Sequence, residues 1–409
     1  MLKRIKTEHL QPGMYLQQLC GSWMSHPFWR ASFLLNNPQD IRRIRDSGIQ
    51  EVWIDTDKGL DVGGGQSKPE VETQIDRDLD AVAVRESAPP GPAPLAEEIQ
   101  RAAKTCAKAK RAVVSMFREA RMGKAIESDS ARELVEEINS SVARNPSALI
   151  SIARLKHADD YTYMHSVAVC GLMIALARQM QLDEQQTRDA GLAGLLHDIG
   201  KMAIPPEVLN KPGKLTDEEF TLVKTHPEEA HKMLSNAKGI SEVALDVCLH
   251  HHEKVDGSGY PHRLPRERIS QFAKMGAVCD VYDAVTSDRP YKKGWDPGEA
   301  VRRMAEWSSG HFESAVFHAF VKAVGIYPIG ALVRLRSGRL GVVVEQSGQS
   351  LLTPKVKVFF STKSEVRITP EIVDLARVSG EKILAQEDPE KWRFPDLEEL
   401  WRGAGPRPW

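Results

Sequence analysis

The hydrophobic positions of residues 148–330 recur at helical spacing almost throughout, which predicts a mainly helical domain. Thr216 and Glu219 have the spacing of a capping box, so a helix is expected to begin there. Ser241 is expected to begin another helix that runs into a histidine triplet, and a further helix is expected over residues 270–286.

Residues 1–62 have a mixed pattern that predicts a small α+β module. Asn37 can cap a helix and Pro38 fits its first turn, whereas Glu51–Asp55 has the composition of a strand. Two roles stay open for this module, which are a sensory or partner-binding input and a stabilising appendage.

Residues 63–95 predict a flexible linker, because glycines open the segment, prolines close it and little between them could form a core. Amphipathic helices are expected over residues 96–121 and 128–144, within a connecting region that spans 96–147. They could pack on the following domain or pair with a second subunit, and packing is the favoured interpretation.

The period changes again in residues 331–409. The runs Leu332–Leu335, Gly341–Val344 and Val356–Phe360 alternate with glycine and serine turns. This pattern predicts a small β-hairpin extension, followed by a partly ordered tail.

Composition narrows the class of protein. The 409 residues are sufficient for two to three domains, and 41% hydrophobic with 27% charged residues is typical of a soluble globular chain. A net charge of −1 gives no field that favours nucleic acid or an anionic membrane. No apolar run approaches the roughly 20 residues of a membrane span, so no membrane insertion is expected. The five scattered cysteines indicate reduced thiols, and we therefore expect a cytoplasmic protein.

The candidate chemistry centres on the adjacent pair His197–Asp198. The apolar run Ala190–Leu196 predicts a buried helix that would hold this pair rigid. Further residues able to bind metal lie on both sides of it. A mixed nitrogen and oxygen ligand set suits Fe, Mn, Zn, Ni or Co better than Ca. These further residues are His165, His226, His250, His251, His252, Glu253 and Asp280.

This series of motifs resembles the HD superfamily of metal-dependent phosphohydrolases. The stretches His251–Pro261 and Asp280–Lys292 narrow the resemblance to the HD-GYP subfamily, over residues 148–330. The resemblance implies an all-helical HD-type metal phosphohydrolase domain, between a small α+β N-terminal domain and a short β-rich C-terminal extension. HD-GYP proteins are bacterial phosphodiesterases that hydrolyse cyclic di-GMP. Residues 1–62 are similar to a domain often found in front of HD-GYP domains.

The resemblance also implies two divalent transition metal ions that share a bridging hydroxide, with Fe or Mn expected first and Ni, Co or Zn as alternatives. Asp198 matches the bridging ligand. Tyr161 stands where some family members have a glutamate for a third metal, which favours a two-metal site. By position, the first metal takes His165, His197 and Asp280, and the second takes His226, His251 and His252. His250 is then expected to lie outside the ligand set.

Four residues match catalytic or substrate-binding positions of the family. Lys201 could offset charge or protonate the leaving oxygen, or be a solvated surface lysine. Tyr260 could contact guanine or phosphate, and Arg289 and Lys292 match residues that contact substrate, with solvated loop residues as the alternative. For the metal ligand Asp280, an ion pair with Arg289 or Lys274 stays open as a structural alternative.

The function that this resemblance implies is hydrolysis of cyclic di-GMP to linear pGpG, and a second cleavage to GMP stays open. Two other functions stay open. The domain could be a cyclic-dinucleotide receptor that acts through a homodimer or a signalling partner, or a phosphohydrolase acting on other nucleotides. Turnover of cyclic di-GMP and a substrate panel would separate the three.

Overall fold

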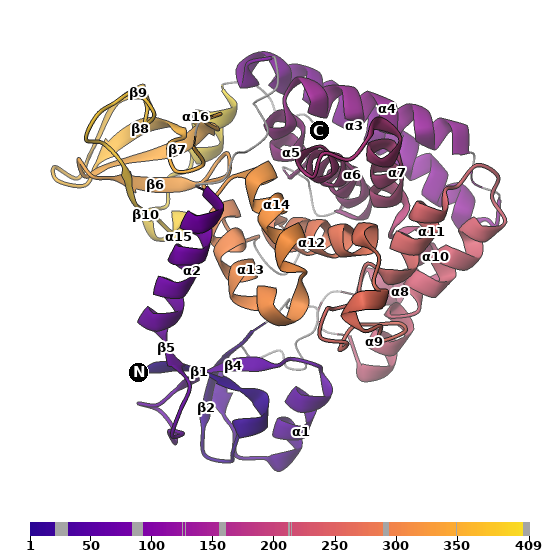
Figure 1. Ribbon diagram of the computed structural model, residues 1–409, viewed down its shortest axis with the longest axis horizontal. Coiled ribbons are helices and arrows are strands. Elements are labelled where there is room, and N and C mark those ends of the chain that lie inside the picture. Colours follow the sequence, from indigo (N-terminus) through magenta and orange to yellow (C-terminus); the bar gives the residue numbers. More distant parts are fainter. Residues whose placement is uncertain are drawn as a thin grey trace.

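A computed structural model of the chain describes residues 1–20, 32–83, 93–124, 126, 128–154, 161–211, 213, 215–288, 294–348 and 350–403. Helices form the body of the molecule, and one small antiparallel sheet lies at each of two corners of it (Figure 1). This agrees with the predicted fold class, which is a mainly helical domain between a small α+β module and a β-rich extension. No helix in the described ranges is long and apolar enough to span a bilayer.

The N-terminal sheet has the strand order β3-β2-β4-β1-β5. Asn37 accepts a bond from Gln39 N and caps α1, and β4 occupies the predicted strand positions, so both local predictions are confirmed. The core of this module is apolar and includes Ile44 and Ile54, both fully buried. Its elements are β1 (Leu2–Lys6), η1 (Thr7–His9), β2 (Tyr15–Leu19), β3 (Phe33–Leu34), α1 (Pro38–Asp46), β4 (Glu51–Asp55) and β5 (Gln66–Ser67).

The predicted linker is wrong over residues 68–83, which form helix α2 (Lys68–Ala83). Val71, Ile75 and Leu79 lie on its buried face and join the main hydrophobic core. These residues recur every four positions, which is the spacing of one face of a helix. The glycines before them and the prolines after them favoured the prediction of a linker instead. In Figure 1 this helix runs away from the N-terminal sheet alongside α13.

The two predicted connecting helices are present as α3 (Leu95–Arg121) and α4 (Ser128–Arg144). They pack on α5 (Pro146–Arg154), α6 (Tyr161–Gln179) and α7 (Glu184–Leu196) of the same chain. Phe117 and Ile138 are fully buried in this contact, and Glu98 accepts bonds from Arg144 Nε and Nη2 at 2.9 and 2.8 Å. Both helices therefore cover the domain that follows them.

Two of the remaining helices, α11 and α12, pack on α7. The predicted capping box at Thr216 is formed, Ser241 caps α11, and Ser270 caps α12. The described part of residues 148–330 contains only helices and turns, as its pattern predicted. These elements are η4 (Ile199–Ala203), α8 (Pro206–Leu209), α9 (Asp217–Val223), α10 (His226–Ser235), α11 (Glu242–His250), η5 (Arg266–Arg268), α12 (Gln271–Thr286), α13 (Pro297–His311) and α14 (Ser314–Val324).

The C-terminal extension is larger than the predicted hairpin. It is a five-stranded antiparallel sheet of order β10-β6-β7-β8-β9, because two further runs, β9 and β10, also pair as strands. β9 is mostly solvent-exposed and β10 is short, so neither has the buried apolar pattern from which a strand is predicted. The strands are β6 (Leu332–Leu335), β7 (Arg339–Glu345), β8 (Lys355–Ser361), β9 (Val366–Asp374) and β10 (Ile383–Gln386).

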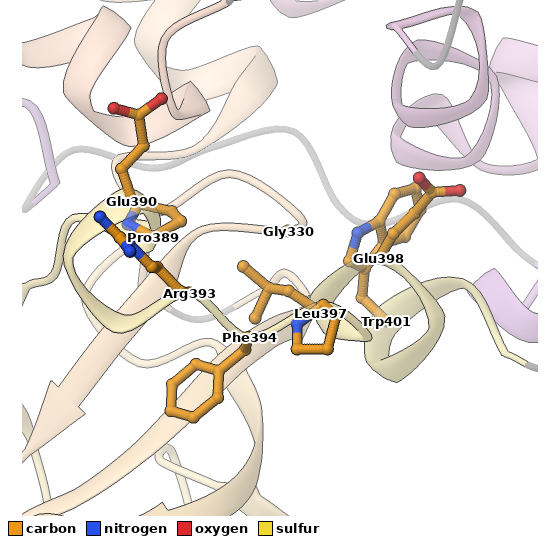
Figure 2. Close-up of a pocket in the computed structure, with 9 residues that line it drawn as sticks. Gly330, Pro389, Glu390, Arg393, Phe394, Leu397, Glu398 and Trp401 are labelled. Atoms are coloured by element: carbon orange, nitrogen blue, oxygen red, sulfur yellow. The ribbon is translucent and has the colours of Figure 1, made fainter.

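The tail folds back on this sheet as α15 (Pro389–Trp392) and α16 (Leu397–Arg402). The ring of Phe394 lies 4.8 Å from that of Phe359, which anchors the turn between the two helices. Together with Gly330, the tail lines a pocket of about 600 Å³ (Figure 2). This pocket shares no residue with the histidine cluster described next.

Candidate metal centre

Seven metal-capable side chains from five segments meet at the inner end of α7. Six of them are supplied by a helix or its cap, and His252 follows the C-cap of α11 in a turn. His226 opens α10 next to Pro227, and Asp280 lies on the body of α12. Six of the seven are at most 3% exposed, and the exception is His252. The seven are His165 of α6, His197 and Asp198 after α7, His226, His251 and His252 at the end of α11, and Asp280.

Three of the imidazoles are oriented by backbone carbonyls. His197 Nδ1 lies 2.8 Å from the oxygen of Gly194, and His226 Nδ1 lies 2.8 Å from that of Val223. His251 Nδ1 lies 3.0 Å from the oxygen of Val247. A carbonyl can only accept, so each Nδ1 carries a proton, and in the neutral form of each ring the bare Nε2 faces inward.

A carboxylate orients the fourth imidazole. Asp283 Oδ2 lies 2.6 Å from Nδ1 of His165, and both side chains are buried. Asp283 is one helical turn after Asp280 on α12, so one helix supplies both a candidate ligand and the group that orients its neighbour. Carboxylate–histidine pairs of this kind fix the tautomer of a metal ligand and raise its basicity.

The two oxygens of Asp198 face two different sets of histidines. Oδ1 lies 3.3 Å from His226 Nε2 and 4.0 Å from His251 Nε2. Oδ2 lies 3.5 Å from His165 Nε2 and 3.4 Å from His197 Nε2. A carboxylate placed in this way can share its oxygens between two cations.

The donor atoms fit a pair of divalent cations. The Nε2 atoms of His226 and His251 are 3.4 Å apart, and with both Nδ1 atoms protonated two lone pairs face each other. Within the described ranges, Asp198 Oδ1 and Asp280 Oδ2 are buried and accept no hydrogen bond of good geometry. Such an arrangement is costly without a cation.

The clusters of donor atoms agree with two positions for a cation. In each cluster the donor atoms lie within 4.8 Å of one another. Asp198 belongs to a third cluster of the same size that joins the two sets. One set is His165, His197 and Asp280, the other is His226, His251 and His252, and the joining set is His197, Asp198 and His251.

The carboxylates at the centre are ionised. Burial alone would raise the pKa of Asp198, but Lys201 and the neighbouring His197 hold that pKa well below its usual range. Burial also opposes ionisation of Asp280, yet His165 and the other facing imidazoles lower its pKa. The two carboxylates in turn outweigh burial and raise the pKa of His197. The site therefore attracts positive charge.

The opposite side of the centre favours neutral imidazole. Burial lowers the pKa of His251 to about 3, and the facing His197 and His226 add to this effect. Burial also lowers the pKa of His252 well below its usual range, with His251 contributing. Ionised carboxylates and neutral imidazoles are the protonation states that transition-metal ligands require.

The close packing of η4 against α10 explains why a glycine stands at position 200 of the His-Asp-x-Gly-Lys segment. A Cβ built on Gly200 would lie 2.0 Å from the carbonyl oxygen of His226 and 2.4 Å from the amide nitrogen of Ala230. Only a residue without a side chain lets η4 approach α10 this closely. This contact places His226 next to Asp198 Oδ1, whereas His165 of α6 lies next to Oδ2.

The structure places two of the four predicted catalytic or substrate-binding residues. The Lys201 ammonium pairs with Asp198 Oδ2, so Lys201 reaches the centre. The ring of Tyr260 stacks on that of His252 at 4.6 Å between centroids. Arg289 and Lys292 lie outside the described residues.

The contacts also show where the side chains of Asp280, His250 and Glu253 point. Lys274 pairs with Glu313 at 3.6 Å, whereas Asp280 Oδ1 lies 2.9 Å from His165 Nε2. His250 turns away from the centre, and its Nδ1 lies 2.8 Å from Asp246 Oδ1. The carboxylate of Glu253 also points elsewhere, toward backbone amides that follow the Gly-Tyr-Pro turn.

Sequence reasoning missed Asp283. Its signal is the spacing of three residues after Asp280, which puts both carboxylates on one face of a helix. The sequence alone does not show that His165 stands opposite that face.

A helical domain with this histidine and aspartate constellation defines a metal-dependent phosphohydrolase of the HD type. The family profile described as "HD domain" matches residues 139–316, and one described as "Domain of unknown function (DUF3391)" matches residues 2–131. The cyclic di-GMP phosphodiesterase PA4108 of Pseudomonas aeruginosa is 58% identical over 409 residues, which cover 98% of this chain and 96% of that protein. The chain belongs to the HD-GYP family.

More distant relatives match a smaller part of the chain. The cyclic di-GMP phosphodiesterase response regulator RpfG of Xanthomonas campestris is 38% identical over 40% of this chain and 44% of its own length. The 3′3′-cGAMP-specific phosphodiesterase 1 of Vibrio cholerae is 36% identical over 40% of this chain and 38% of its own length. The names of these relatives thus cover more than one cyclic dinucleotide.

Proposed function

We propose that this protein is a cytoplasmic, metal-dependent phosphodiesterase that hydrolyses cyclic di-GMP to linear pGpG, and cleavage of pGpG to GMP stays an open second step. The observation that carries the proposal is the geometry of Asp198, whose two oxygens face two separate histidine sets. This geometry occurs in a chain that is 58% identical, over nearly its whole length, to a relative named a cyclic di-GMP phosphodiesterase.

The centre is assigned as dinuclear, with Asp198 as the shared ligand. The first cation would be held by His165, His197 and Asp280, and the second by His226, His251 and His252. Tyr161 supplies no carboxylate at the position where a third cation would need one. Two divalent cations held there would act as Lewis acids, lowering the pKa of a water molecule and offsetting negative charge on the phosphodiester.

The surrounding residues supply the remaining functions. Lys201 is paired with Asp198 at the edge of the centre, where its ammonium can protonate the leaving oxygen or offset charge on the phosphate. Tyr260 is assigned to substrate contact, since its ring lies against His252. We assign phosphate or guanine contacts to Arg289 and Lys292, because cationic side chains bind these groups strongly and cannot ligate a metal.

The mixed nitrogen and oxygen donor set favours Fe or Mn, and it also suits Ni, Co and Zn. A different cyclic dinucleotide is the second candidate substrate, because relatives named 3′3′-cGAMP-specific phosphodiesterases are also similar to part of this chain. These relatives are 36% and 37% identical over only 40% and 34% of the chain, so cyclic di-GMP is the first choice.

Metal analysis of protein purified without oxygen, combined with a substrate panel, tests the proposal. Two tightly bound ions per chain and turnover of cyclic di-GMP in preference to 3′3′-cGAMP are expected. Three ions, each with its own anomalous signal in a crystal, would overturn the dinuclear assignment. Binding of cyclic di-GMP without turnover by the metal-loaded protein would instead identify a receptor.

A further inference from the structure

The side chains of the four consecutive residues His250–Glu253 point in two different directions. The inner two, His251 and His252, face the metal centre. The outer two face the segment that follows Tyr260. Glu253 is only 2% exposed, although its carboxylate is outside every cluster of metal-capable atoms in the described ranges.

The Glu253 carboxylate binds the backbone on the far side of the Gly-Tyr-Pro turn. Oε1 accepts a hydrogen bond from the amide of His262 at 2.7 Å, and Oε2 accepts one from the amide of Leu264 at 3.0 Å. A buried carboxylate that accepts two backbone hydrogen bonds holds them strongly, because the bonds are charge-assisted and water does not replace them.

The turn itself folds back onto the residues that precede it. A Cβ built on Gly259 would lie 2.4 Å from Lys254 N and 2.5 Å from Glu253 Cα, so the two backbones are in close contact. The amide of Tyr260 donates to the carbonyl oxygen of His252 at 3.2 Å. Residues on both sides of Tyr260 are thus fixed to the strip of chain that carries the metal ligands.

These contacts determine where the Tyr260 ring lies. It stacks on His252, and the ammonium of Lys224 is 5.7 Å from its centroid. The stacked ring therefore lies directly against a side chain of the metal-capable cluster.

We propose that Glu253 is a positioning residue, which holds the Tyr260 turn against the metal-ligand strip so that Tyr260 meets the substrate. Among the residues that the structure describes, the Glu253 carboxylate belongs to no cluster of metal-capable atoms, so it is not assigned as a ligand. Its effect is transmitted through the amides of His262 and Leu264, which lie two and four residues after Tyr260. This inference rests on the proposed function, since Tyr260 is assigned there to substrate contact.

Glu253→Gln is the first test, because it keeps the volume but removes the charge and turns an NH₂ group toward one of the two amides. Hydrogen–deuterium exchange should become faster in residues 257–264, while the metal content stays at the wild-type value. KM for cyclic di-GMP should rise about tenfold, with a smaller change in kcat, as expected when ground-state binding is lost.

Two further variants keep the test decisive. Gly259→Ala pushes the turn away from the opposite side and should give the same faster exchange and raised KM with the metals retained. Glu267→Gln changes an exposed carboxylate on the adjoining turn and should match wild type. If Glu253→Gln misfolds, Gly259→Ala decides the outcome.

Wild-type exchange in residues 257–264 for both Glu253→Gln and Gly259→Ala would overturn the proposal. So would faster exchange with an unchanged KM, because the turn would then not position a substrate contact. If wild-type protein binds metal but hydrolyses no cyclic dinucleotide, the proposed function fails, whereas faster exchange in the variants would still show that Glu253 positions the turn.

Discussion

Asp283→Asn isolates the group that orients His165. Asp283 Oδ2 lies 2.6 Å from His165 Nδ1, and the two side chains are 3% and 1% exposed. A buried hydrogen bond to a charged group contributes about 1.5–3 kcal/mol, against about 1 kcal/mol for a neutral one. The amide keeps the acceptor but loses the charge, so the loss should be about 1–2 kcal/mol, or roughly 5–30-fold in metal affinity.

Competition between the metal-free protein and a chelator of known affinity, with Mn²⁺ as the probe, measures this loss. Half-loading should need roughly 5–30-fold more free Mn²⁺, and at saturating Mn²⁺ the loading should recover. Asp189→Asn is the matched control, since Asp189 accepts a bond from Gln185 on the surface of α7. A titration curve that superimposes on that of wild type would refute the argument that Asp283 sets the affinity through His165.

Three further perturbations test other parts of the structure. Asp198→Ala should leave far-UV circular dichroism unchanged but abolish both metal retention and hydrolysis, and near-normal turnover with metals retained would contradict the bridging assignment. Arg289→Ala and Lys292→Ala should each lower kcat/KM by an amount equivalent to on the order of 1–3 kcal/mol, without changing metal content. Unchanged kcat/KM would show that both are solvated loop residues. A chain beginning at residue 64 should keep its metals and activity, whereas one beginning at residue 95 should melt at lower temperature, because burial of each large aliphatic side chain of α2 contributes about 1.5–3 kcal/mol. Equal melting temperatures would show that α2 does not stabilise the domain.

The local signals in the sequence predicted much of the helical domain. The capping residues Thr216 and Ser241 begin helices where expected, since a cap acts through its own neighbouring amides. The same reasoning failed for α2, because its apolar face is buried by packing on α13 and α14, which are distant in the sequence. It also underestimated the C-terminal sheet, because the exposed strand β9 is specified by pairing with β8 and not by its own pattern.

The candidate ligands could be found from residue type and order, because a metal needs particular donor atoms and the family motif fixes their spacing. The sequence did not determine the direction in which each donor points. That depends on contacts between distant segments, such as Asp283 with His165 across 118 residues and Glu253 with the turn beyond Tyr260. It depends also on the approach of Gly200 to His226, which brings two helices together around Asp198.

The sequence by itself therefore determined which atoms are available to bind a metal and which segments are helical, since both depend on residue identity and near neighbours. Only the tertiary structure decided that Asp198 faces two histidine sets and that His250 and Glu253 turn away from the centre. The physical reason is that a side chain's direction is fixed by whatever packs against its backbone, and here those partners come from other helices.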